Sequence, residues 1–340
     1  MTSPTWMERE AREAPQVAAK LVEASDTLKE LADQLCLLKP AYALAAGRGS
    51  SDAAALFAKY LFEMRLGLPT VSAAPSIRSI YGRRLNLEQA LLLAISQSGQ
   101  SPDLLEFCRA ASGKNVLRVG LINDLASPLA AAVDICLPLL AGREQSVAAT
   151  KSCLSAMTLV FGLTAHWAKD ADMIAAFKRA PEALAEGLSR SWPGAEEFLA
   201  GEGPVYVIGR GPGLAIAAEA ALKLKETCAI HAEAVSSAEV RHGPFALAGP
   251  HLRVIVLAQQ DAAFEGLRVT AAELAERGCP VMFISSEPAL SKALIRADQE
   301  PVLELLQMLA RFYLLANATA LSRGRSPDHP PMLSKVTETR

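Results

Sequence analysis

A cluster of hydroxyl groups follows a strongly apolar run in the stretch ISQSGQSPD, residues 95–103. Its polar side chains include Ser96, Gln97, Ser98 and Ser101. Pro102 and Asp103 then suit the first turn of a helix. Hydroxyls, backbone N–H groups and a helix N-terminus together make a site for an anion. A serine-rich turn that only caps the helix is the alternative, and the local pattern leaves both open.

A second polar cluster lies in the segment ALKLKETC and the residues that follow it. Glu219, Lys223 and Glu226 are spaced i, i+4 and i+7, so they share one face of a helix. Such spacing usually means a solvated stripe of ion pairs, but the surrounding residues are nearly all Ala, Leu and Ile. A wholly exposed face is therefore less assured.

His242 stands on a Gly-Pro turn in the segment AEVRHGPF. Histidine is the side chain best suited to proton transfer near neutral pH. A lone histidine beside a turn is more often structural, and the pattern alone does not decide between the two roles.

The elements that must position these residues occur twice along the chain. AYALAAGRGSSDAAALFAKYLFE and PVYVIGRGPGLAIAAEAALKLKE are both a short apolar run, a Gly-Arg-Gly and an alanine-rich helical segment. Gly47 aligns with Gly209, an offset of 209 − 47 = 162. The same offset aligns two further apolar runs, at 95–97 and at 119–122, with their counterparts. We interpret the chain as two copies of one α/β unit.

Each copy alternates short apolar runs with helix-length segments. In the first copy the runs are near 42–46, 69–73, 90–96, 117–122 and 134–139. This pattern predicts a parallel sheet with helices on both faces. Ligands bind at the C-terminal edge of such sheets, which is where SQSGQS falls. The second copy reads AQQDAA there, so the fold does not require the serines, and their presence favours a function.

The Gly-Arg-Gly of the first copy, Gly47, Arg48 and Gly49, invites comparison with a dinucleotide-binding loop. Neither copy has the G-x-G-x-x-G pattern, because the two read GRGSSD and GRGPGL. No acidic residue closes a following strand at the expected distance. We expect these glycines to let the backbone approach a small ligand instead.

Composition excludes several classes of protein. With 340 residues, 51% hydrophobic and 21% charged, the chain suits two well-packed domains. A net charge of −2 without a basic block argues against nucleic acid as a partner. The N-terminus lacks the apolar core of a signal peptide, and residues 152–168, with His166, are too short to span a membrane. Six scattered cysteines indicate neither zinc nor disulfides. We expect a cytoplasmic protein with no metal or cofactor and no membrane partner.

Four ordered motifs resemble a known family. ISQSGQSPD resembles the phosphate loop of double sugar-isomerase (SIS) domain proteins, and EQSVAATKS at 144–152 their E-x-x-V-A-x-T-K segment. ALKLKET with EVRHGP resembles their catalytic region, and DHPPMLSKVTE at 328–338 their C-terminal tail. The chain is similar to the isomerase half of glucosamine-6-phosphate synthase. Its EQSVAATK looks closer to stand-alone type II glucosamine-6-phosphate deaminases.

The resemblance implies two tandem SIS domains, each a five-stranded parallel sheet between layers of helices. The domains are expected at 39–170 and 201–325. The remaining ranges are an N-terminal helical segment at 1–38, a helical connector at 171–200 and an active-site tail at 326–340. The glutaminase domain of the synthase is not seen before residue 39, so synthesis of an amino sugar is the less expected direction of reaction.

The resemblance also assigns roles. Glu226 matches the base that moves a proton between C1 and C2 of the open sugar. His242 matches the residue that opens the ring, which in this family comes from the partner subunit of a homodimer. Lys223 matches a lysine near the open sugar, and Lys335 a tail lysine that forms a Schiff base with the ketose. The expected substrate-binding residues are Gly47, Arg48, Gly49, Ser96, Gln97, Ser98, Ser101 and Val147.

The chemistry of these residue types agrees with those roles. Aldose–ketose isomerisation needs a carboxylate to carry the proton and a second acid/base at the ring oxygen. The expected reaction converts glucosamine 6-phosphate and water to fructose 6-phosphate and ammonia. Ala149, where the synthase has a serine that touches the sugar, leaves other reactions open. They are a plain phosphosugar isomerase, a deglycase, an aminotransferase-like enzyme or a non-catalytic sugar-phosphate sensor.

Overall fold

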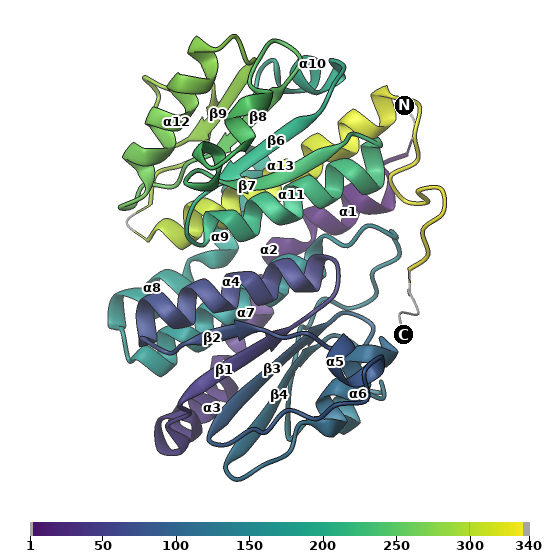
Figure 1. The fold of residues 1–340 in the computed structure, drawn as a ribbon, viewed down its shortest axis with the longest axis vertical. Coiled ribbons are helices and arrows are strands. Elements are labelled where there is room, and N and C mark those ends of the chain that lie inside the picture. The colour runs from purple at the N-terminus through teal and green to yellow at the C-terminus, as the bar shows by residue number, and fades with distance from the viewer. Residues whose placement is uncertain (1–2, 299, 336–340) are drawn as a thin grey trace. The chain divides into compact units, whose positions relative to one another are not determined.

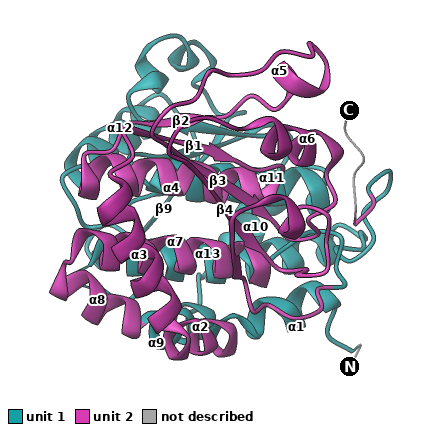
Figure 2. Cartoon of the chain, turned by 90° about the horizontal axis from the view of Figure 1, so that it is seen from below, with its two compact units in different colours: residues 1–15, 145–150, 180–333 teal, residues 16–144, 151–179, 334–340 magenta. Residues whose placement is uncertain are grey.

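The structure is a computed structural model that describes residues 3–298 and 300–335. The described chain divides into two compact units, shown in different colours in Figure 2. Unit 1 contains residues 1–15, 145–150 and 180–333, and unit 2 contains residues 16–144, 151–179 and 334–340. Each unit is built around one parallel sheet.

The sheet of unit 2 has five parallel strands in the order β2-β1-β3-β4-β5. The strands are β1 (Tyr42–Ala46), β2 (Thr70–Ser72), β3 (Ala90–Ser96), β4 (Val116–Ile122) and β5 (Ile135–Pro138). The helices between and after them are α4 (Ser50–Leu66), α5 (Ser76–Ser79), α6 (Pro102–Ala110), η1 (Ala130–Ala132), α7 (Lys151–Ala168) and α8 (Ala171–Lys178). Every residue of β3 is buried, as expected of a central strand covered on both faces.

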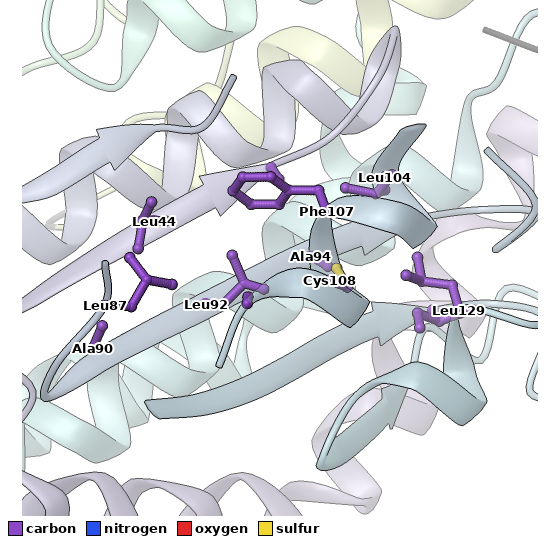
Figure 3. Close-up of a cluster of buried hydrophobic side chains, with 12 residues drawn as sticks. Leu44, Leu87, Ala90, Leu92, Ala94, Leu104, Phe107, Cys108 and Leu129 are labelled. Atoms are coloured by element: carbon purple, nitrogen blue, oxygen red, sulfur yellow. The ribbon is translucent and has the colours of Figure 1, made fainter. Parts of the chain in front are cut away.

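A cluster of apolar side chains holds α6 on this sheet (Figure 3). Leu104, Phe107 and Cys108 of α6 pack on Leu92 and Ala94 of β3. The loop 97–101 connects these two elements, so the same packing fixes both of its ends.

Unit 1 repeats the architecture, with strand order β10-β9-β8-β6-β7. Its strands are β6 (Val205–Gly209), β7 (Ala232–Ser236), β8 (Arg253–Leu257), β9 (Val281–Ser285) and β10 (Ala293–Leu294). Its helices from residue 180 onward are α9 (Ala180–Ser189), α10 (Ala195–Ala200), α11 (Gly213–Cys228), η2 (Glu239–Arg241), η3 (Pro244–Leu247), α12 (Phe264–Glu276) and α13 (Pro301–Ser322). Figure 1 shows α12 beside β8 and β9, where its apolar side chains join the core.

The predicted α/β class with two five-stranded parallel sheets is confirmed. Pairing the strands by the 162-residue repeat matches β1 to β6 and β3 to β8, and the two strand orders then coincide. The five apolar runs predicted for the first copy each contain the matching strand to within a residue or two.

The remaining segments are helical or irregular. The N-terminal residues form α1 (Trp6–Arg12), α2 (Ala14–Glu23) and α3 (Ser25–Leu38). The apolar segment 152–168 lies in α7, whose residues 151–165 are all buried. Among the described residues, no helix combines the length and the apolar character that crossing a membrane requires.

Candidate active site

The serine loop after β3 is held by two internal hydrogen bonds. The Ser96 hydroxyl accepts the Gly99 N–H at 2.9 Å, and the Ser98 hydroxyl accepts the Gln100 N–H at 3.3 Å. Ser101 is the N-cap of α6, but its side chain makes no capping hydrogen bond. The simple capping role therefore does not explain Ser101, and its hydroxyl remains available to a ligand at the helix N-terminus.

Gly99 fixes the path of this loop. Its φ of +62° lies in the left-handed region that favours glycine. A Cβ at this position would lie 2.0 Å from the hydroxyl oxygen of Ser127, which is buried. Glycine at position 99 is thus required both by backbone conformation and by space.

Arg48 reaches the same end of α6. Its Nε donates to Asp103 Oδ2 at 2.8 Å, and a second guanidinium nitrogen binds the same carboxylate oxygen. Asp103 is buried, whereas the Arg48 side chain is 45% exposed. The structure thus brings Arg48 to the first turn of α6, where it is bound to Asp103.

Gly47 has a packing role that the sequence did not indicate. A Cβ at this position would lie 2.3 Å from the carbonyl oxygen of Ser51, in the first turn of α4. Gly209 of the second copy stands in the same relation to Gly213. Close strand–helix packing accounts for this repeated glycine, whether or not a ligand lies near it.

The acid–base cluster on α11 is buried, so its interpretation as a solvated stripe is wrong. The side chains of Glu219 and Lys223 are fully buried, and that of Glu226 is 23% exposed. The Lys223 ammonium binds Glu226 Oε2 and lies 3.5 Å from Glu219 Oε1. An ammonium between two carboxylates in an apolar helix is costly to bury, which points to a role other than stability.

His242 lies in an exposed turn held on α12. Arg241 forms an ion pair with Glu273 at 2.7 Å, and the guanidinium groups of Arg241 and Arg277 stack on Phe245. No hydrogen bond of the His242 side chain appears within the described residues, and only its backbone N–H is bound, to Glu239. The structure of one chain thus positions the turn and leaves the imidazole accessible.

Lys335 is held by a buried carboxylate. Its ammonium lies 3.0 Å from Glu144 Oε2, and the Glu144 side chain is fully buried. The Ser152 hydroxyl and N–H donate to the same carboxylate at 2.7 and 3.2 Å. Glu144 and Ser152 are the two ends of the EQSVAATKS motif, so this motif and the tail meet at one carboxylate.

The described tail is anchored at Asp328. The Asp328 carboxylate accepts the backbone N–H groups of Trp6 and Met7, both at 2.8 Å, and its carbonyl accepts the Val147 N–H at 3.1 Å. Residue 328 is therefore held by hydrogen bonds and does not belong to a frayed end. Val147 lies against the tail; residues 336–340 of the predicted tail lie outside the described residues.

In the second copy, the corresponding end of the sheet is occupied by a carboxylate of the protein itself. Glu304 of α13 is fully buried, and its carboxylate accepts the Gln260 N–H at 2.7 Å and the Ser286 hydroxyl at 3.0 Å. Burial raises the pKa of Glu304. Gln260 corresponds to Ser98 of the first copy by the 162-residue offset. The Glu304 carboxylate thus occupies the hydrogen-bond donors at this end of the second sheet. The loop of the first copy remains the candidate anion site.

The predicted residues are divided between the two units. Unit 2 contains the serine loop with Arg48, and the Glu144–Lys335 pair. Unit 1 contains the buried cluster of α11 and the turn of His242. Two residues that contact Lys335 and Glu219 were not predicted: Glu144, which binds the Lys335 ammonium, and Tyr313 of α13, whose hydroxyl donates to Glu219. Glu144 opens a recognised motif and could have been inferred, whereas Tyr313 carried no sequence signal.

Comparisons with known proteins agree with this architecture. The SIS domain family matches residues 39–165 and 198–296. A glutamine–fructose-6-phosphate aminotransferase from Caulobacter vibrioides is 32% identical over 306 residues, which cover 84% of this chain and 50% of that protein. The chain spans about half the length of the curated relatives it matches.

Solved structures extend the similarity over the chain. A candidate phosphosugar isomerase from Silicibacter pomeroyi has a TM-score of 0.89 and 36% identity, covering 96% of this chain and all of that one. A glucosamine-6-phosphate deaminase from Thermotoga maritima has a TM-score of 0.74 and 22% identity, covering 95% of this chain and all of that one, and shows similarity of fold alone. Both sheets and the matched ranges lead to one conclusion: this chain belongs to the SIS domain family.

Proposed function

We propose that this protein is an amino-sugar phosphate deaminase/isomerase that converts glucosamine 6-phosphate and water to fructose 6-phosphate and ammonia. The observation that carries the proposal is the ammonium of Lys223 between two carboxylates in an apolar helix. It supplies a carboxylate for proton transfer, Glu226, and a cation to steady the enediolate-like intermediate.

The proposed steps use one proton carrier and one water molecule. His242 opens the pyranose, and Glu226 then takes the proton from C2 and returns it to C1. This converts the 2-amino aldose to a ketose imine. Water adds to C2 of the imine, and the C2–N bond breaks to release ammonia and leave the ketone. Lys335 can exchange with the departing amine by forming its own imine at C2.

In this proposal the phosphate group anchors the sugar in the site. The serine loop and Arg48 bind it, and its binding energy orients the reacting end of the sugar. In the second copy, the buried Glu304 carboxylate already binds the Gln260 N–H, which supports the first copy as the phosphate site. Similarity to a phosphosugar isomerase candidate over the whole length of that chain supports the substrate class.

The decisive experiment is to incubate the protein with glucosamine 6-phosphate and to assay fructose 6-phosphate and ammonia together. Equal amounts of both products are expected. Conversion of other sugar phosphates without release of ammonia would show a plain isomerase. Tight binding of sugar phosphates with no product at all would show a sensor.

The phosphate loop gives the first prediction. Ser98→Ala should weaken binding of fructose 6-phosphate about tenfold or more, because a hydrogen bond to a charged group contributes about 1.5–3 kcal/mol. Ser98 is a cleaner target than Ser96, because its hydroxyl accepts the Gln100 N–H at 3.3 Å, a longer bond than the 2.9 Å from the Gly99 N–H to the Ser96 hydroxyl. Calorimetry measures the affinity, with the exposed Ser112 at the far end of α6, changed to alanine, as the control. Unchanged affinity in Ser98→Ala would remove the loop from phosphate binding.

The exposed His242 gives the second prediction. We propose a homodimer in which His242 serves the partner's site, as its lack of a side-chain partner among the described residues and the family resemblance suggest. His242→Ala and Glu226→Gln should each be inactive alone. After subunit exchange by mild denaturation and refolding of the mixture, up to about a quarter of the wild-type activity should return, since a mixed dimer contains one intact site. A mixture that exchanges subunits but stays inactive would contradict shared sites.

A further inference from the structure

Tyr313 of α13 is buried against the acid–base cluster of α11. Its side chain is fully buried, and its hydroxyl donates to Glu219 Oε1 at 2.9 Å. Helices α11 and α13 run side by side in unit 1 (Figure 1). The phenol thus has its polar end on a carboxylate, as buried tyrosines require.

The oxygen that Tyr313 binds is the one nearest Lys223. Glu219 Oε1 accepts the phenol and lies 3.5 Å from Lys223 Nζ, beyond ordinary hydrogen-bond length. The same ammonium hydrogen-bonds to Glu226 Oε2. Lys223 is therefore placed unequally between its two carboxylates, with the direct hydrogen bond on the side of Glu226.

The phenol explains this asymmetry. Glu219 and Lys223 are both fully buried, so their attraction is screened little and each competes for the partners within reach. A hydroxyl donated to Glu219 Oε1 satisfies part of that carboxylate and weakens its pull on the ammonium. Without the hydroxyl, Lys223 would move toward Glu219 and loosen its hold on Glu226, the partly exposed member of the cluster.

We infer that Tyr313 is a positioning residue that, through Glu219 and Lys223, holds the Glu226 carboxylate in place for proton transfer. It does not touch the substrate. The inference rests on the proposed role of Glu226 as proton carrier, and it adds a residue of α13 whose type and spacing gave no indication of a role.

The test compares four variants: Tyr313→Phe, Glu219→Gln, the double variant, and Tyr206→Phe as the control. Tyr206 is also buried in unit 1, but it packs in the apolar cluster beneath α12. For each protein, proton NMR in D2O measures deuterium exchange into glucosamine 6-phosphate and fructose 6-phosphate. Steady-state assays measure kcat and KM for release of ammonia, and thermal unfolding monitors the fold.

Tyr313→Phe should lower both kcat and the exchange rate about tenfold and leave KM unchanged, because the phosphate loop belongs to the other unit. In the Glu219→Gln background the same change should have no further effect, since the neutral amide no longer competes for Lys223. Tyr206→Phe should change neither rate. If Tyr313→Phe does not fold, Tyr313→Met fills the space without a donor and replaces it.

Three results would overturn the inference: unchanged rates in a folded Tyr313→Phe, an effect on KM alone, or an equal loss in both backgrounds. Failure of the proposed function looks different. Wild-type exchange without ammonia would reject deamination and still let the variants decide the role of Tyr313. A wild-type protein that releases no ammonia, forms no ketose and exchanges no proton in either sugar phosphate would reject both.

Discussion

Glu226→Gln is expected to lose turnover by a factor of about 10²–10⁴, the range typical of removing a general base. The amide has nearly the shape of the carboxylate but cannot accept a proton from C2 of the sugar. The fold should survive, because Lys223 keeps the buried carboxylate of Glu219 as a partner. The oxygen of the introduced amide can also accept the hydrogen bond that Glu226 accepts now.

Binding separates loss of chemistry from loss of the site. Calorimetry should show that Glu226→Gln still binds fructose 6-phosphate, since the serine loop and Arg48 are unchanged and lie in the other unit. Glu233→Gln is the matched control, because Glu233 is an exposed carboxylate on β7. If Glu226→Gln retained wild-type kcat, another group would have to be the proton carrier and the proposed mechanism would be wrong.

Lys335→Ala is the second change expected to have a large effect, a loss of turnover by a factor of about 10² or more. The substitution removes the amine that is proposed to exchange with the substrate nitrogen. It also removes the ammonium that lies 3.0 Å from the buried Glu144 carboxylate, although the two hydrogen bonds from Ser152 remain. The loss could therefore arise from chemistry or from the ion pair.

Lys335→Arg distinguishes these two causes. A guanidinium keeps the positive charge and can bind Glu144, but it is not a nucleophile at neutral pH. If Lys335 acts as an amine, Lys335→Arg should be as inactive as Lys335→Ala while its melting temperature stays near that of the wild type. Activity retained in Lys335→Arg would show that the charge is what matters and would exclude a Schiff base.

Point substitution is a better test of the tail than deletion. Removing residues 327–340 would also remove Asp328, whose carboxylate caps the start of α1 by accepting the N–H groups of Trp6 and Met7. Such a deletion is expected to destabilise unit 1 as well as to remove Lys335. Loss of activity on deletion would then not report on the lysine.

Much of the fold was determined by patterns that are local in the sequence. The apolar runs of the first copy mark its five strands, because parallel strands buried on both faces need nearly continuous apolar residues. The repeat of Gly-Arg-Gly at positions 47 and 209 predicted the duplicated sheet, and the two strand orders confirm it. The residue types of ISQSGQSPD likewise indicated an anion site at the end of β3, because hydroxyls there are needless for the strand.

Burial and long-range partners were decided only by the tertiary structure. The i, i+4, i+7 spacing of Glu219, Lys223 and Glu226 is the same for a solvated stripe and for a buried cluster. Packing of α13 on α11, with Tyr313 bound to Glu219, decides between them. The pairing of Glu144 with Lys335 joins residues 191 positions apart. The hydrogen bond from the Gln260 N–H to Glu304 joins the end of β8 to α13. Such contacts depend on how separate elements pack, which no local pattern of residues contains.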